Sequence, residues 1–115
     1  SRYWSYSSAP SAKSINLTGY SKLTMTYYVY WGSYYDGNGA RGWVKMGTTN
    51  SYITDPALTF EHVAQVADMS SSTSIGQKTL TLDVSSINAT KYITAQVTGF
   101  RGYGFGIYIY QISLS

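Results

Sequence analysis

The segment Lys22–Trp31 alternates apolar and polar residues with a period of two. Apolar side chains occupy every second position from Leu23 onward, and threonines and tyrosines fill most of the positions between them. Strict alternation over this length predicts a β-strand with one face in the core. The same alternation returns at Lys78–Val84, Tyr92–Thr98 and Phe105–Tyr110. The pattern therefore predicts four half-buried strands.

Successive side chains of a strand point to opposite faces, so the alternation also predicts which residues face the core. The expected inward positions of the last three strands are Leu80, Leu82 and Val84, then Ile93, Ala95 and Val97, then Phe105, Ile107 and Ile109. The expected outward positions include Tyr92, Thr94, Gln96 and Thr98, and then Gly106, Tyr108 and Tyr110.

Shorter strands are predicted at Arg2–Ser7, Ile15–Leu17 and Trp43–Met46. Turn-forming residues separate the strands, for example the Asp-Gly-Asn-Gly run at 36–39. Many short strands without alternating helices predict an all-β fold, an antiparallel two-sheet β-sandwich of jelly-roll-like type with about seven or eight strands. We expect residues 1–115 to form one such domain, which a longer protein could contain.

The stretch Asp55–Met69 fits two interpretations. Asp55 followed by Pro56 is a good helix start, and apolar residues after it also fit a helical stripe. The alternating set Phe60, His62, Ala64 and Val66 instead fits a strand. We favour the strand for residues 56–67, because the neighbouring segments all have a period of two.

The composition favours recognition over catalysis. The chain has 13 tyrosines and 3 tryptophans but no cysteine, one histidine and 5 carboxylates. Tyrosine and tryptophan supply large, stiff contact surfaces with a polar tip. No carboxylate pair with glycosidase geometry can be identified, and His62 lies outside any nucleophile motif. We therefore expect no enzymatic activity, no cofactor and no metal.

Charge and hydropathy narrow the expected partners. Only 11% of the residues are charged, and the eight basic residues are scattered rather than clustered, which argues against nucleic-acid binding. No apolar run approaches the roughly 20 residues that span a bilayer, so we expect no membrane insertion. With no cysteine, the chain forms no disulfides.

Three separated blocks carry a resemblance to a known class of domains. They are Ile15–Met25, Lys78–Asn88 and the closing segment Ile109–Leu114. These blocks resemble β-sandwich domains of tail-associated proteins of phages and prophages of Gram-positive bacteria; Asn16 stands where that pattern often has Asp. Domains of this kind look like carbohydrate-binding modules. The resemblance implies attachment to a host surface, or a structural role in the tail, and an extracellular or virion location.

The candidate ligand site is the aromatic and polar segment 31–43, with a second cluster at 100–106. Flat aromatic faces can cover the apolar side of a sugar ring, while Asp, Asn and Arg can pair with its hydroxyls. The expected ligand-binding residues are Trp31, Tyr34, Tyr35, Asp36, Asn38, Arg41 and Trp43, with Arg101 and Tyr103 from the second cluster. An equally weighted alternative is that Trp31 and Trp43 are core residues that flank a hairpin.

A second aromatic surface is expected on the outward strand faces. Its members are Tyr28, Tyr30, Tyr92, Tyr108 and Tyr110, which would form one platform if their strands are neighbours in one sheet. Two functions follow as expectations: recognition of a cell-surface glycan, or a structural module that forms a homo-oligomer through this tyrosine surface and has no ligand of its own.

Overall fold

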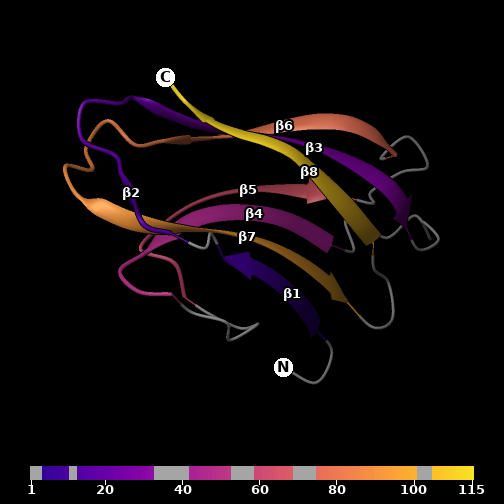
Figure 1. Ribbon diagram of the computed structural model, residues 1–115. Helices are drawn as coiled ribbons and strands as arrows, with labels where there is room; N and C mark the ends of the chain where they lie inside the picture. Colours follow the sequence, from indigo (N-terminus) through magenta and orange to yellow (C-terminus); the bar gives the residue numbers. More distant parts are fainter. Residues whose placement is uncertain (1–3, 11–12, 33–41, 53–58, 69–74, 101–104) are drawn as a thin grey trace.

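The computed structural model describes residues 4–10, 13–32, 42–52, 59–68, 75–100 and 105–115. Within these residues the chain forms β-strands, arranged in two antiparallel sheets that face each other (Figure 1). This arrangement confirms the predicted all-β class and the two-sheet sandwich.

The larger sheet has the strand order β1-β7-β4-β5, and β2 also pairs with β7. Its strands are β1 (Trp4–Pro10), β2 (Ile15–Asn16), β4 (Gly42–Thr49), β5 (His62–Asp68) and β7 (Thr90–Phe100). Pro10 ends an edge strand, where its missing N–H removes no bond from the centre of the sheet.

The smaller sheet has the order β6-β3-β8. Its strands are β3 (Lys22–Gly32), β6 (Gly76–Asp83) and β8 (Phe105–Leu114). The chain passes repeatedly between the two sheets, as in a jelly-roll-like sandwich (Figure 1).

The ambiguous stretch before residue 70 contains a strand. β5 covers His62–Asp68 and pairs with β4 along its whole length. This confirms the strand interpretation for residues 62–67, whereas residues 53–58 lie outside the described part of the chain.

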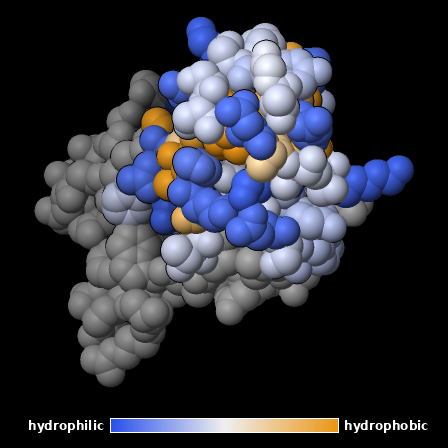
Figure 2. All heavy atoms as spheres, turned by 90° about the vertical axis from the view of Figure 1, so that its left-hand side faces the viewer, coloured by the Kyte–Doolittle hydropathy of each residue, from blue (hydrophilic) through white to orange (hydrophobic). Residues whose placement is uncertain are grey.

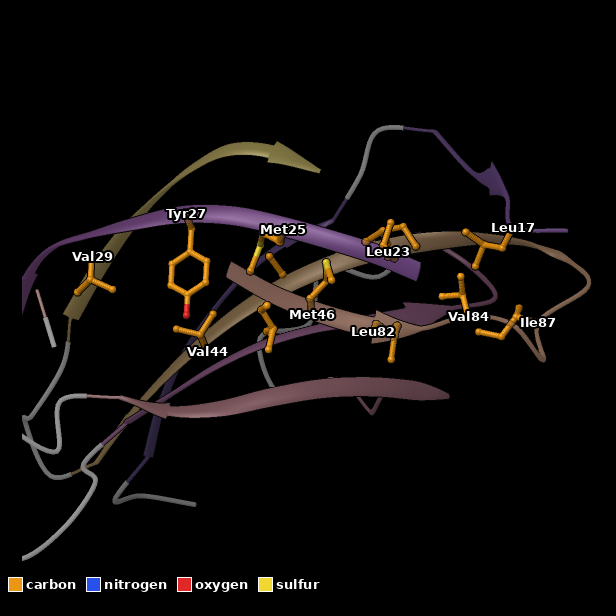
Figure 3. Packing of buried hydrophobic residues seen from close by; sticks show 13 residues of the cluster. Leu17, Leu23, Met25, Tyr27, Val29, Val44, Met46, Leu82, Val84 and Ile87 are labelled. Carbon is orange, nitrogen blue, oxygen red and sulfur yellow. The ribbon is translucent and has the colours of Figure 1, made fainter. Parts of the chain in front are cut away.

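The core lies between the sheets and follows the predicted alternation of β3. Leu23, Met25, Tyr27 and Val29 are all buried, and so are Val44 and Met46 of β4. Figure 3 shows the ring of Tyr27 pointing across the space between the layers toward Val44. Leu80 and Leu82 of β6 complete this side of the core.

The outer face of the larger sheet departs from the prediction. Thr94 and Gln96 of β7 were expected to face solvent, yet both are buried. Thr94 is the cross-strand partner of Gly47 in β4, and the ring of Phe60 lies directly over Gly47. The segment before β5 therefore covers part of this face, and a pattern within one strand does not contain that information.

A second departure concerns β8. Ile109 shares the inward face with its partner Tyr27, as predicted, but it remains 40% exposed. The opposite sheet covers the inward side chains at the β8 edge only in part, whereas at the β6 edge it buries Leu80 and Leu82.

Two turns are closed by short side chains. Asn16 Oδ1 accepts a hydrogen bond from the Thr18 amide at 3.0 Å. Asp83 Oδ1 accepts bonds from the Ser85 amide at 2.9 Å and from its hydroxyl at 2.7 Å. Both turns lie in the blocks that carry the family resemblance, so these residues have a structural role as Asx turns.

Candidate functional site

The predicted ligand residues lie largely outside the described part of the chain. Those outside it are Tyr34, Tyr35, Asp36, Asn38, Arg41, Arg101 and Tyr103. Trp31 lies in β3 opposite Gly106, and Trp43 lies in β4, where its side chain is half-buried.

The strands that flank the two predicted clusters end together. Gly32, the last residue of β3, pairs with Phe105, the first residue of β8. Gly42, the first residue of β4, pairs with Gly99 near the end of β7. Both predicted clusters are therefore attached at one end of the sandwich, on the right in Figure 1.

The connection from β3 to β4 is not the hairpin that was considered for Trp31 and Trp43. β3 pairs with β6 and β8, while β4 pairs with β5 and β7 in the other sheet. The Asp-Gly-Asn-Gly sequence at 36–39 is compatible with a hairpin and with a link between two sheets. The local sequence alone does not distinguish these two connections.

Four of the five tyrosines expected to form one surface are on neighbouring strands. Tyr28 and Tyr30 belong to β3, and Tyr108 and Tyr110 belong to β8. Tyr28 is the direct cross-strand partner of Tyr108, and the rings of Tyr30 and Tyr108 stack with their centroids 4.4 Å apart and an interplanar angle of 26°. We call these four residues the tyrosine face.

The tyrosine face is open to solvent. The exposed fractions are 43% for Tyr30, 58% for Tyr108 and 63% for Tyr110. Tyr30 lies two positions before the end of β3, and Tyr108 lies near the start of β8. The stacked pair is thus close to the end of the sandwich from which the predicted clusters depart.

Two irregularities in the pairing of β3 and β8 fall on tyrosines of this face. Between Val29 and Trp31 the register advances by two residues on β3 and by one on β8, so Tyr30 is the extra residue. Between Thr26 and Tyr27 the extra residue is Tyr110 of β8. β-bulges redirect side chains locally, and here each bulge presents an exposed tyrosine.

Hydroxyl groups extend the tyrosine face toward the other end of the sheet. Thr24 and Thr26 of β3 lie on the same face as Tyr28, and Thr24 Oγ1 lies 3.4 Å from Thr81 Oγ1 of β6. The surface thus combines aromatic rings with neutral hydrogen-bonding groups, which is a mixture suited to a neutral polar ligand.

The fifth tyrosine lies in the other sheet. Tyr92 of β7 packs edge-to-face against Tyr52, with the ring centroids 6.0 Å apart. Beside it, Lys91 Nζ lies 3.1 Å from a Glu61 carboxylate oxygen and donates a hydrogen bond to Asn50 Oδ1. Sequence reasoning missed this cluster, because its residues come from three separate segments and no short-range pattern connects them.

The two ends of the sandwich differ in character. Figure 2 shows the end that carries the turns near residues 50 and 85, opposite the end where β3 finishes. Its described surface consists mostly of hydrophilic and intermediate residues, with some hydrophobic residues visible between them. The exposed stacked tyrosines belong to the other half of the molecule.

The acidic side chains of the described residues do not form a metal-holding group. No group of three His, Cys, Asp or Glu side chains among them could hold a metal ion. The Glu61 carboxylate is paired with Lys91, and Asp83 accepts the bonds from Ser85. No helix in the described part of the chain has the length and apolarity to cross a membrane.

The described residues present an exposed aromatic platform, the stacked tyrosines of β3 and β8, on one face of the smaller sheet. Comparison with known proteins found no similarity: the sequence matches no protein-family model, no curated protein and no solved structure.

Proposed function

We propose that this domain is a non-catalytic recognition module that binds a carbohydrate of a host cell surface. The observation that carries the proposal is the stacked, exposed pair Tyr30 and Tyr108 on the tyrosine face. Phenol rings present the flat apolar surface on which the C–H side of a pyranose packs, and their hydroxyls can bond to sugar hydroxyls.

The strand ends next to the predicted ligand residues support the same proposal. The segment 31–43 and the cluster around Arg101 are attached to strands that end close to Tyr30 and Tyr108. In the proposed complex, Tyr30 and Tyr108 stack on the sugar, Asp36, Asn38 and Arg41 pair with its hydroxyls, and Arg101 and Tyr103 border the site. The resemblance to tail-associated sandwich domains supports a host-surface glycan as the ligand and a virion location.

The charge distribution suits a neutral ligand. No residue of the tyrosine face carries a charge, and charged residues make up only 11% of the chain. A strongly anionic polymer would require a basic patch, and the basic residues are scattered along the sequence. We therefore expect neutral cell-wall polysaccharides to bind better than acidic ones.

The test is a glycan array that includes bacterial cell-wall polysaccharides, probed with the tagged domain as a monomer and in multimerised form. Tyr108→Ala is expected to weaken binding of the identified glycan roughly tenfold or more, since a central aromatic anchor contributes at least about 1–2 kcal/mol. Tyr108→Phe keeps the ring and should retain most of the affinity.

The matched control is Tyr52→Ala, which removes another exposed tyrosine, one that follows β4 and packs against Tyr92 of the larger sheet. Equal losses in the Tyr52 and Tyr108 variants would contradict a site on the tyrosine face. Loss only in Tyr34→Ala or Trp43→Ala, with Tyr108→Ala unchanged, would move the site to the 31–43 segment alone.

A structural module without a ligand is the second candidate, and the exposure of Tyr108 and Tyr110 favours it. Aromatic side chains at this exposure are suited to burial against a sister subunit. Silence of the array in both formats, together with oligomers that Tyr108→Ala or Tyr110→Ala dissociates, would establish this alternative.

A further inference from the structure

β8 is an edge of the smaller sheet that carries neither a charged residue nor a proline. Within the described residues it pairs with β3 on one side and with no strand on the other. An edge strand presents a row of unpaired backbone N–H and C=O groups, which can template pairing with another strand. Proteins usually block such edges with charges, prolines, an inward-pointing lysine or a bulge, and of these β8 has only the bulge at Tyr110.

The other three sheet edges carry these protections. β6 contains Lys78 and Asp83, β5 contains His62 and Asp68, and β1 ends in Pro10. The ten residues of β8, Phe105–Leu114, include neither a charged residue nor a proline. Of the four edge strands, β8 alone contains neither a charged residue nor a proline.

One row across the smaller sheet makes the contrast direct. Tyr27 of β3 has Lys78 as its partner on the β6 side and Ile109 as its partner on the β8 side. Cross-strand partners share a face, so the inward row ends in a lysine at one edge and in an isoleucine at the other. The lysine opposes strand addition at β6, whereas the isoleucine favours it at β8.

Among the described residues, two inward isoleucines of β8 are left partly exposed at this edge. Ile109 and Ile112 remain 40% and 39% exposed, although their β3 partners Tyr27 and Met25 are buried. A strand added at this edge would bring its own inward side chains against both isoleucines. The edge therefore offers backbone pairing and apolar contact together.

We propose that β8 pairs antiparallel with β8 of a second copy of this chain, giving a two-fold dimer with a continuous six-stranded sheet. In a two-fold arrangement the same strand edge of each copy is paired, so the backbone N–H and C=O groups of one β8 can bond to those of the other. Each copy has a net charge of +3, yet neither β8 contributes a charge, so the pairing brings no like charges together along the strands.

The two-fold axis of such a pair is perpendicular to the sheet, since only this axis relates two antiparallel strands of one sheet. Both tyrosine faces then lie on the same side of the dimer, and the partly exposed isoleucines of the two copies meet on the inward side. The dimer would present two tyrosine faces in one plane, which increases avidity for a repeating polymer.

The contact area predicts a weak dimer. Strands rise about 3.3 Å per residue, so ten paired residues form a contact about 33 Å long. With side chains on both faces this contact covers several hundred Å² per copy, which is less than the roughly 800 Å² of a standard interface. The association should therefore be reversible and depend on concentration.

The test is sedimentation velocity of the chain from about 1 μM to about 1 mM, without any glycan. The wild type should move from a monomer of 12.7 kDa toward a dimer as its concentration rises. Ile112→Lys and Tyr110→Lys place a charge at the edge, and each should weaken dimerisation by at least about tenfold, because a charged side chain on an edge strand opposes the addition of another strand.

Thr79→Lys is the matched control, because it adds the same charge at an exposed position of the opposite edge strand β6. It should dimerise like the wild type.

Tyr110 is exposed at a bulge, so its variant stays informative if Ile112→Lys fails to fold, which circular dichroism would reveal. A monomer at every concentration, or equal weakening by all three lysines, would overturn the proposal. The measurement does not depend on glycan binding, so its failure would leave the proposed recognition function standing.

Discussion

Gly47 of β4 has a packing role that no other residue type can fill without rearrangement. A Cβ at this position would come closer than 3.0 Å to the His62 carbonyl oxygen and to the Phe60 ring. The neighbouring backbone oxygen belongs to the paired strand β5, so it cannot move away freely. This contact explains how the outer face of the larger sheet is covered next to Thr94.

Gly47→Ala should therefore lower the free energy of unfolding by about 1–3 kcal/mol, the usual cost of overpacking. Urea denaturation followed by circular dichroism measures it. Wild-type stability in this variant would contradict the close packing of Phe60 on β4.

The Asp83 carboxylate gives the molecule a defined response to acid. The Ser85 hydroxyl and then the Ser85 amide, with a smaller contribution from Lys22, hold the pKa of Asp83 below its ordinary value of 3.8. A lowered pKa in the folded state adds stability that is fully present above the unfolded value and is lost as the pH falls through the folded value.

Asp83→Asn should consequently be less stable than the wild type at neutral pH, and the difference should shrink as the pH drops below 3.8. Thermal unfolding of both proteins across this pH range measures the difference. A gap between the two melting temperatures that stays constant down to the lowest pH would argue against the lowered pKa.

At the scale of the strand, β3 and β8 show what the sequence could and could not predict. The alternation of β3 identified its buried side chains correctly, because this strand is central in its sheet and faces the core along its length. The same pattern in β8 placed Ile109 on the inward face correctly but did not predict its 40% exposure, because coverage depends on how far the opposite sheet extends. The bulges at Tyr30 and Tyr110 have no glycine or other sequence signal.

Truncation of core side chains should reflect this difference between central and edge strands. Leu23→Ala in β3 removes a fully buried side chain and should cost about 2–5 kcal/mol. Ile109→Ala should cost clearly less at protein concentrations low enough to keep the chain monomeric, because its side chain is already partly solvated. Chemical denaturation of both variants provides the comparison, and equal costs would contradict the open edge of β8.

At the scale of the whole molecule, the topology brings distant aromatic segments together. Tyr30 and Tyr108 are 78 positions apart in the sequence, yet they stack because β3 and β8 are neighbours in one sheet. The sequence predicted that such a surface would form if the strands were adjacent, and it grouped Tyr92 with the others. Strand order decided the outcome, and alternation within single strands carries no information about strand order.

The central claim is that the tyrosine face binds a glycan, and NMR titration of the ¹⁵N-labelled domain tests it most directly. With a glycan identified on the array, shifts should concentrate in the amides of Tyr28, Tyr30 and Tyr108, while those of Tyr52 and Tyr92 should stay in place. Shifts confined to the Tyr52 and Tyr92 region, or none with any cell-wall polysaccharide at millimolar concentration, would contradict the proposed function.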